Sequence, residues 1–80
     1  MIFRQVSALD LLFWCIMIKI NGAPLNIPEM SLAEYLKTTT YNPRLIAVEL
    51  NGEIVPKAKY GETLLKDGDT VEIVSFVGGG

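Results

Sequence analysis

The sequence predicts a small α+β domain, with one helix packed on one face of a mixed β-sheet of four to five strands. Two Asn-Gly pairs, at residues 21–22 and 51–52, each separate two short segments in which apolar and polar residues alternate. Asn-Gly favours a two-residue hairpin turn, because both central residues need a positive φ. Between the two hairpins, Ser31 and Glu34 have the spacing of a helix capping box.

The strands of the two hairpins are expected at residues 17–20, 25–27, 46–50 and 53–55. A proline, Pro28 or Pro56, follows the second strand of each hairpin. Proline ends a strand because it has no N–H to donate to the ladder of hydrogen bonds. The strand over 53–55 is therefore expected to be short and to lie at an edge of the sheet.

The helix between the hairpins has one apolar face, formed at the helical period by Leu32, Tyr35 and Leu36. Three consecutive threonines at 38–40 are poor helix formers and are expected to end it near Asn42 and Pro43. The segment before the last strand is irregular, and we expect Tyr60 and Leu64 to anchor it to the core. This apolar pattern is typical of a packed core rather than of a cofactor site.

The last strand is expected over residues 70–77, after an Asp-Gly-Asp turn. Val71 and Ile73 are expected to face the core. Val74 and Phe76 fall in the outward phase of this strand, where polar residues are usual. Either a partner protein docks on these two side chains, or another part of the chain covers them.

A right-handed connection through the helix leaves the last strand beside the first, in the middle of the sheet. This is the β-grasp, or ubiquitin-like, arrangement. The chain then ends in Gly78, Gly79 and Gly80. Glycine has no Cβ, so such a tail can pass through a narrow channel, and three extended residues span about 10 Å. The tail is expected to carry the terminal carboxylate into the active site of another protein, and the alternative is a frayed end.

The first sixteen residues form an apolar leader that differs from the rest of the chain. The leader contains Asp10 and is shorter than the about 20 apolar residues that a membrane helix needs. It also lacks the small-residue cleavage site of a signal peptide. The leader is either a short helix that packs against the domain or a partner, or a non-native segment that precedes a natural start at Met17. The second interpretation is favoured, so the domain is expected at 17–80, with Cys15 outside it.

The composition excludes several classes of function. The 80 residues include no histidine and one cysteine, which excludes a disulfide framework, a Cys/His zinc site and a Ser-His or Cys-His catalytic pair. The net charge is −2, and the seven basic residues are scattered, so no nucleic-acid surface is indicated. We expect a small acidic cytoplasmic protein without a metal, a membrane anchor or catalytic residues of its own.

The residues that carry a resemblance are Asn21-Gly22, the segments 46–56 and 65–74, and the glycine terminus. Together they resemble the ThiS family of ubiquitin-like sulfur carriers. The resemblance covers 17–80 and leaves out the leader, which that family ordinarily lacks. The Asp-Gly-Asp turn and the terminal glycines are shared with the related MoaD carriers, whereas the segment 48–56 is more similar to ThiS. A third terminal glycine is a small departure, which keeps Gly79 and Gly80 as the last pair.

The resemblance implies a carrier of thiamine (thiazole) biosynthesis, not a catalyst. A ThiF-like adenylating enzyme would activate the Gly80 carboxylate with ATP, and sulfur from a cysteine desulfurase relay would convert it to a thiocarboxylate. A thiazole synthase (ThiG-like) would then accept the sulfur. Gly78 and Gly79 would thread the partner's active site, while Val74 and Phe76 would dock on its surface. The alternatives are a carrier for molybdopterin or another sulfur metabolite, and a ubiquitin-like protein modifier.

Overall fold

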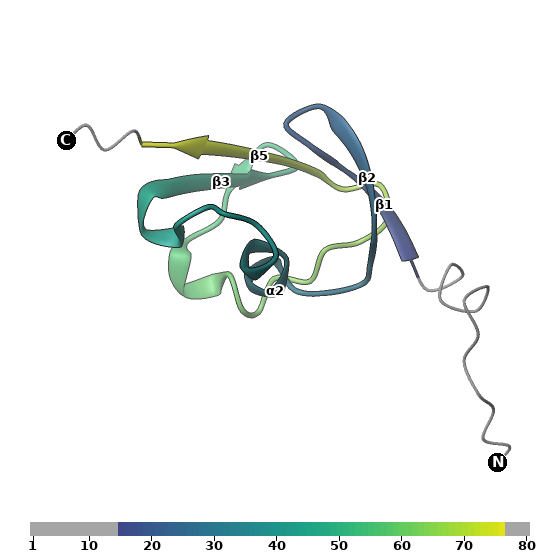
Figure 1. Ribbon diagram of the computed structural model, residues 1–80, viewed down its shortest axis with the longest axis horizontal. Coiled ribbons are helices and arrows are strands. Elements are labelled where there is room, and N and C mark those ends of the chain that lie inside the picture. The colour runs from purple at the N-terminus through teal and green to yellow at the C-terminus, as the bar shows by residue number, and fades with distance from the viewer. Residues whose placement is uncertain (1–14, 77–80) are drawn as a thin grey trace, which may run out of the picture.

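The structure is a computed structural model, and it shows a mixed β-sheet with an α-helix against one face (Figure 1). Its elements are β1 (Cys15–Ile20), β2 (Ala23–Pro28), α2 (Leu32–Lys37), η1 (Pro43–Leu45), β3 (Ile46–Leu50), β4 (Glu53–Ile54), η2 (Lys57–Lys59) and β5 (Thr70–Ser75). The two η segments are single 3-10 turns. Within the part of the chain that the structure describes, the predicted α+β class, with one helix on one face of a mixed sheet, is confirmed.

The structure describes residues 15–76. The leader over 1–14 and the glycine tail, with Gly78, Gly79 and Gly80, lie outside the described residues, so what the sequence predicts for them stays a prediction. Within the described part of the chain, no helix is long and apolar enough to cross a membrane.

The first strand begins earlier than the alternation suggests. β1 starts at Cys15, two residues before the expected start at Met17. Ile16 is buried and lies opposite the buried Ile27 of β2, so it contributes to the core. The start of the strand was predicted two residues too late, at Met17, because residues 15 and 16 are both apolar and show no alternation.

The last strand lies in the centre of the sheet, as predicted. The strand order is β2-β1-β5-β3-β4, with β5 parallel to β1 and antiparallel to β3. This is the β-grasp arrangement. Because β1 and β5 run side by side in the same direction, the chain enters the sheet at one end and leaves it at the other (Figure 1). β4 is short and lies at the edge, which confirms the prediction made from Pro56.

Both Asn-Gly turns adopt the predicted conformation. The φ angle is 50° at Asn21 and 86° at Gly22, and 52° at Asn51 and 89° at Gly52. These positive values match the right-handed twist of the flanking strands, and they are the reason that Asn-Gly is favoured here.

The helix α2 starts at the predicted cap and ends at Lys37, before the three threonines and earlier than expected. The Ser31 Oγ accepts a hydrogen bond from the Glu34 N–H at 3.1 Å, and the Ser31 N–H donates to the Glu34 carboxylate at 3.1 Å. At the other end, the hydroxyl groups of Thr38 and Thr39 donate to carbonyl oxygens of the last turn at 2.6 and 2.7 Å. These side-chain bonds compete with continuation of the helix, so it ends after six residues.

The core fills the space between α2 and the sheet. Its buried members are Ile16, Ile18, Ile27, Leu32, Tyr35, Leu36, Ile46, Val48, Tyr60, Leu65, Val71 and Ile73. The prediction that Val71 and Ile73 face the core is confirmed, as is the anchoring role of Tyr60.

The prediction that Leu64 anchors the segment before β5 to the core is wrong. Its side chain is 56% exposed, and the neighbouring Leu65 is fully buried. Leu64 pairs with Ser31 in a single β-bridge, and the Leu65 N–H donates to the Met30 carbonyl oxygen at 2.9 Å. Neighbouring residues of an extended segment point to opposite sides, so pairing at this register turns Leu65 inward and Leu64 outward.

Candidate functional site

The candidate site is the end of β5, from which the glycine tail continues. Val74 lies on the face of the sheet that α2 does not cover, because it alternates with the buried Val71 and Ile73. Its side chain is 58% exposed, and that of Phe76 is 51% exposed. The structure therefore places both predicted docking residues in the outward phase, and no described segment covers them.

The root of the tail is fixed to the body of the domain. Ser75 lies opposite Ile46 in the β3–β5 ladder, and the Phe76 N–H donates to the Leu45 carbonyl oxygen at 2.7 Å. The last described residue is thus still hydrogen-bonded to η1, the turn that leads into β3. A tail that starts here begins from a defined position and direction.

A clamp that the sequence pattern did not predict lies on the other side of β5. β1 ends at Ile20, but the Asn21 side chain continues the pairing along β5. Its Oδ1 accepts from the Ile73 N–H at 2.6 Å, and its Nδ2 donates to the Ile73 carbonyl oxygen at 3.2 Å. The amide of this turn residue therefore takes the place of a strand backbone.

Asn51, in the second turn, makes a similar clamp at the start of β5. Its Oδ1 accepts from the Thr70 N–H at 2.9 Å, and its Nδ2 donates to the Asp69 carboxylate at 3.0 Å. Aspartate or glycine would also suit these turns, but only asparagine both donates and accepts there. The choice of asparagine in both turns was the one signal in the sequence for these clamps.

The uncovered face of the sheet also carries an acidic pair. Glu49 of β3 and Glu72 of β5 lie directly opposite each other in the antiparallel ladder. Like charges in this position destabilise a sheet, so the pair is unfavourable in the isolated domain. On the same strands, Ala47 and Val74 form the next outward pair toward the tail. The face thus combines an apolar end with two carboxylates, which complements an apolar, basic surface.

The titratable side chains of the described residues do not gather into a metal site. Among residues 15–76, no group of three or more His, Cys, Asp or Glu side chains could hold a metal ion. Burial raises the pKa of the Tyr60 phenol, and burial together with the nearby Tyr41 raises the pKa of Tyr35. Both phenols therefore stay protonated at neutral pH and act as packing groups.

The fold and the site together define the class of protein to which the chain belongs. A sheet in the order β2-β1-β5-β3-β4 with one helix across it, and a glycine run after its central strand, is a ubiquitin-like β-grasp protein. More narrowly, the chain belongs to the ThiS family, whose sequence model matches residues 18–80.

Similar proteins and structures agree with this family. The sulfur carrier protein ThiS of Bacillus subtilis is 35% identical over 66 residues, which is 80% of this chain and all of that protein. A crystal structure of the thiamine biosynthesis protein ThiS from Geobacter metallireducens is 32% identical and superposes with a TM-score of 0.71, covering 81% of this chain and 100% of that one. A thiazole synthase of Paramagnetospirillum magneticum is 44% identical over 62 residues, which is 76% of this chain but 19% of that protein.

Proposed function

We propose that this protein is a sulfur carrier of thiazole formation in thiamine biosynthesis, and that it is loaded at Gly80. Membership of the ThiS family supports this, as do its similarity to the Bacillus subtilis carrier and to a thiazole synthase. The observation that carries the proposal is the anchored end of β5. The strand is hydrogen-bonded up to Phe76, and after Val77 the sequence continues as three glycines. A rigid body would thereby present the carboxylate at a defined place.

The carboxylate needs activation before it accepts sulfur. We propose that a ThiF-like enzyme supplies it with ATP: a carboxylate oxygen attacks the α-phosphate, pyrophosphate leaves, and an acyl-adenylate forms at Gly80. A persulfide sulfur from a cysteine desulfurase relay then attacks the carbonyl carbon, and AMP leaves. A thiol reduces the resulting acyl disulfide to the thiocarboxylate. The protein itself needs no bound cofactor in this scheme, because ATP is bound by the partner.

Glycine suits this chemistry for a steric reason. The Gly80 carbonyl carries no neighbouring side chain that blocks the attacking sulfur, and Gly78 and Gly79 fit a narrow channel. A nucleophile must approach to about 3–3.5 Å along a defined direction, so a Cβ at this point would obstruct it. In this scheme the protein is a co-substrate of its partners and not an enzyme.

The uncovered sheet face would hold the adenylating partner. Val74 and Phe76 supply the apolar contact, while Glu49 and Glu72 favour a partner whose surface is basic. A partner that brings a cation to the two carboxylates would relieve their mutual repulsion. A ThiG-like thiazole synthase would use the loaded tail afterwards. We place these steps in the cytoplasm, where ATP and the desulfurase are available.

Intact-mass analysis tests the proposal. The full chain is incubated with ATP, a ThiF-like enzyme, a cysteine desulfurase, L-cysteine and a thiol. Replacement of one oxygen by sulfur at the terminus adds about 16 Da, and the loaded protein then supports thiazole formation by a thiazole synthase. A conjugate with a mass increase of several thousand daltons would instead identify a protein modifier. Transfer of the sulfur only to a molybdopterin precursor would identify the other carrier class.

A further inference from the structure

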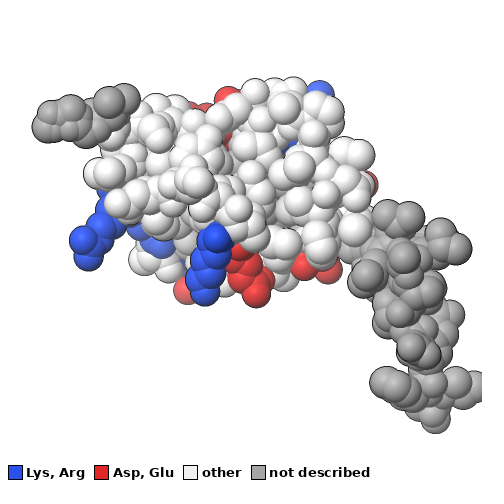
Figure 2. Space-filling view, viewed as in Figure 1, with Lys and Arg blue, Asp and Glu red and all other residues white. Residues whose placement is uncertain are grey.

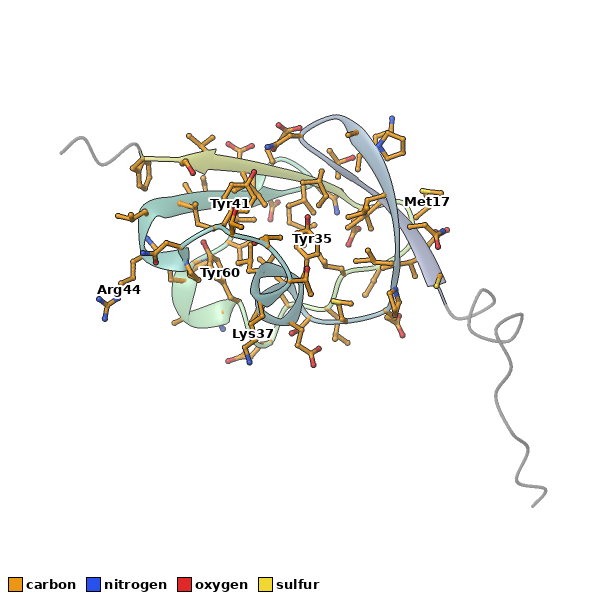
Figure 3. All side chains as sticks on the ribbon, viewed as in Figure 1. Met17, Tyr35, Lys37, Tyr41, Arg44 and Tyr60 are labelled. Carbon is orange, nitrogen blue, oxygen red and sulfur yellow. The ribbon has the colours of Figure 1, made fainter. Side chains whose placement is uncertain are left out.

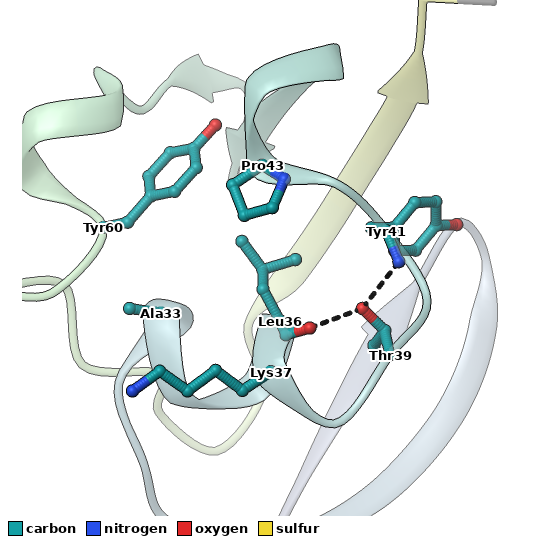
Figure 4. Close-up of a pocket in the computed structure, with 7 residues that line it drawn as sticks. All are labelled: Ala33, Leu36, Lys37, Thr39, Tyr41, Pro43 and Tyr60. Atoms are coloured by element: carbon teal, nitrogen blue, oxygen red, sulfur yellow. Dashed lines mark hydrogen bonds between the residues drawn. The ribbon is translucent and has the colours of Figure 1, made fainter.

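A second surface lies on the helix side of the molecule, away from the uncovered sheet face. It is a mostly apolar pocket with a volume of about 290 Å³ (Figure 4). Its wall is formed chiefly by Ala33, Leu36, Tyr41, Pro43 and Tyr60, and the Lys37 side chain runs along one side. A volume of this size accommodates one bulky side chain and part of its neighbours.

The walls of this pocket are already ordered. The Thr39 hydroxyl donates to the Leu36 carbonyl oxygen at 2.7 Å and accepts from the Tyr41 N–H at 3.2 Å (Figure 4). Across the pocket, the Ala33 N–H donates to the Tyr60 carbonyl oxygen at 3.0 Å. A ligand therefore has little ordering to impose on the walls, which favours binding.

The pocket lies next to the root of the tail. Pro43, in its wall, is the first residue of η1, and Leu45 is the last. The Leu45 carbonyl oxygen accepts the hydrogen bond from the Phe76 N–H at 2.7 Å. One short 3-10 turn thus joins the pocket to the start of the tail, and four further residues reach at most about 14 Å from Phe76 to the terminus.

Two basic side chains lie at or directly next to the pocket. Lys37 lies beside the pocket, and Arg44 follows Pro43 and points into solvent (Figure 3). Figure 3 labels Arg44 at the lower left and Lys37 at the lower centre, and the same view in Figure 2 shows basic side chains along this side with acidic ones beside them. Among the described residues, neither Lys37 nor Arg44 forms an ion pair.

We propose that this pocket docks the sulfur donor, through an acidic segment of the donor that places one bulky apolar side chain in the pocket. The inference rests on the proposed function. The apolar walls fit the side chain, and the unpaired cations at the rim fit carboxylates on either side of it. The same carboxylates would be repelled by Glu49 and Glu72, so an acidic segment is directed to the helix side of the molecule.

The order of the proposed loading steps indicates that the sulfur donor, and not another partner, occupies the pocket. The sulfur donor must reach the Gly80 carbonyl while the adenylating enzyme still holds the activated tail. If that enzyme covers Val74 and Phe76, the sheet face is occupied at this step. The pocket is then the prepared surface that remains open beside the tail. The thiazole synthase acts after the adenylating enzyme has left, so it does not need a separate surface.

The step served by docking is the persulfide attack. The donor's persulfide sulfur bonds to the carbonyl carbon, AMP leaves with the electrons of the broken C–O bond, and an acyl disulfide joins carrier and donor. Two thiol molecules then reduce the disulfide, giving the thiocarboxylate, the donor's thiol and one new disulfide. Free sulfide can replace the donor, because its sulfur attacks the same carbon and gives the thiocarboxylate directly. Sulfide therefore bypasses docking without bypassing adenylation.

This bypass gives the test. Thiocarboxylate formation on the full chain is measured by intact mass with the ThiF-like enzyme and ATP, in two arms. One arm uses sodium sulfide, and the other uses a cysteine desulfurase with L-cysteine and a thiol. The variants are Lys37→Glu, which reverses a charge at the rim, and Ala33→Leu, which fills the pocket. Lys66→Glu is the matched control, since it makes the same charge change at an exposed lysine in the loop before β5.

We expect Lys37→Glu and Ala33→Leu to load at the parent rate with sulfide, but about tenfold more slowly with the desulfurase. Lys66→Glu should match the parent in both arms. The docking proposal is overturned if the two variants equal the parent in the desulfurase arm, or if they lose the same fraction of activity in both arms. A parent chain that is loaded in neither arm overturns the proposed function and the docking proposal with it.

Discussion

The Asn21 side chain binds both backbone polar groups of Ile73, accepting from its N–H at 2.6 Å and donating to its carbonyl oxygen at 3.2 Å. On the other side of β5, the ladder with β3 continues to Ser75. The central strand is thus held from both sides close to the point where the tail begins. A turn residue performs this task because β1 itself stops at Ile20.

Replacement of Asn21 by glycine is expected to loosen the end of β5. Glycine accepts the positive φ at this position, so the turn is kept and the two side-chain hydrogen bonds are lost. We expect the free energy of unfolding to fall by about 1–3 kcal/mol, from two hydrogen bonds and the added freedom of the unfolded chain. Urea denaturation measures this change. Amide exchange supplies the local readout: unchanged protection of the Ile73 N–H in Asn21→Gly would contradict the clamp.

Truncation of Phe76 is expected to weaken docking without affecting the fold. Its side chain is half exposed, so Phe76→Ser should leave the unfolding midpoint nearly unchanged. Loss of an aromatic contact at an interface typically costs about 1–2 kcal/mol, so the KM of the adenylating enzyme for the carrier should rise about tenfold. Leu64→Ser is the matched control, because Leu64 is similarly exposed and comes from the loop between η2 and β5. An equal rise in KM for both variants would contradict the assignment of Val74 and Phe76 to the docking face.

A side chain at the terminus is expected to block loading. Gly80→Val places a branched group next to the reacting carbonyl, and we expect adenylation by the ThiF-like enzyme to slow by at least about a hundredfold. Release of pyrophosphate measures the rate. Gly61→Val is the control for a general effect of the substitution, because a Cβ at Gly61 meets no atom within 4 Å. Adenylation of Gly80→Val at the parent rate would rule out the loading scheme.

Stability is expected to fall in strongly alkaline solution. The pKa values of Tyr35 and Tyr60 are raised above 10.0 in the folded state, chiefly by burial. The folded protein keeps these protons at pH values where the unfolded chain has lost them. The contribution of these two tyrosines to the free energy of unfolding is therefore complete below the pKa of the unfolded chain. It is lost as the pH rises through the pKa of the folded state. Urea unfolding at about pH 8 and about pH 11 measures the loss, which should be smaller in Tyr60→Phe than in the parent. Identical pH dependence in the two proteins would show that Tyr60 does not contribute.

Much of the fold is predictable from the sequence because its signals are local. The two Asn-Gly turns, the Ser31–Glu34 capping box and the threonines after the helix each set a backbone conformation within a few residues. The alternation along the last strand also predicted correctly that Val74 and Phe76 are exposed. The central position of β5 followed from the handedness of the connection, a rule that needs only the order of the elements.

The features that escaped prediction depend on contacts distant in the sequence. The choice between Leu64 and Leu65 as the buried residue is made by pairing with Ser31, which no local pattern reveals. The clamp between Asn21 and Ile73 joins residues 52 positions apart. The helix-side pocket likewise combines Ala33 with Tyr60, so it exists only once the chain is folded.

The parallel neighbours β1 and β5 separate the two points where the chain enters and leaves the sheet. The distance between these two points, at Cys15 and Phe76, corresponds to about ten strand residues, or roughly 33 Å. An affinity tag or fluorescent label attached ahead of β1 therefore starts far from the end of β5, whereas one attached behind Gly80 would occupy the carboxylate that the proposed scheme loads. Immobilised preparations of this protein should accordingly be tethered through the amino-terminal side.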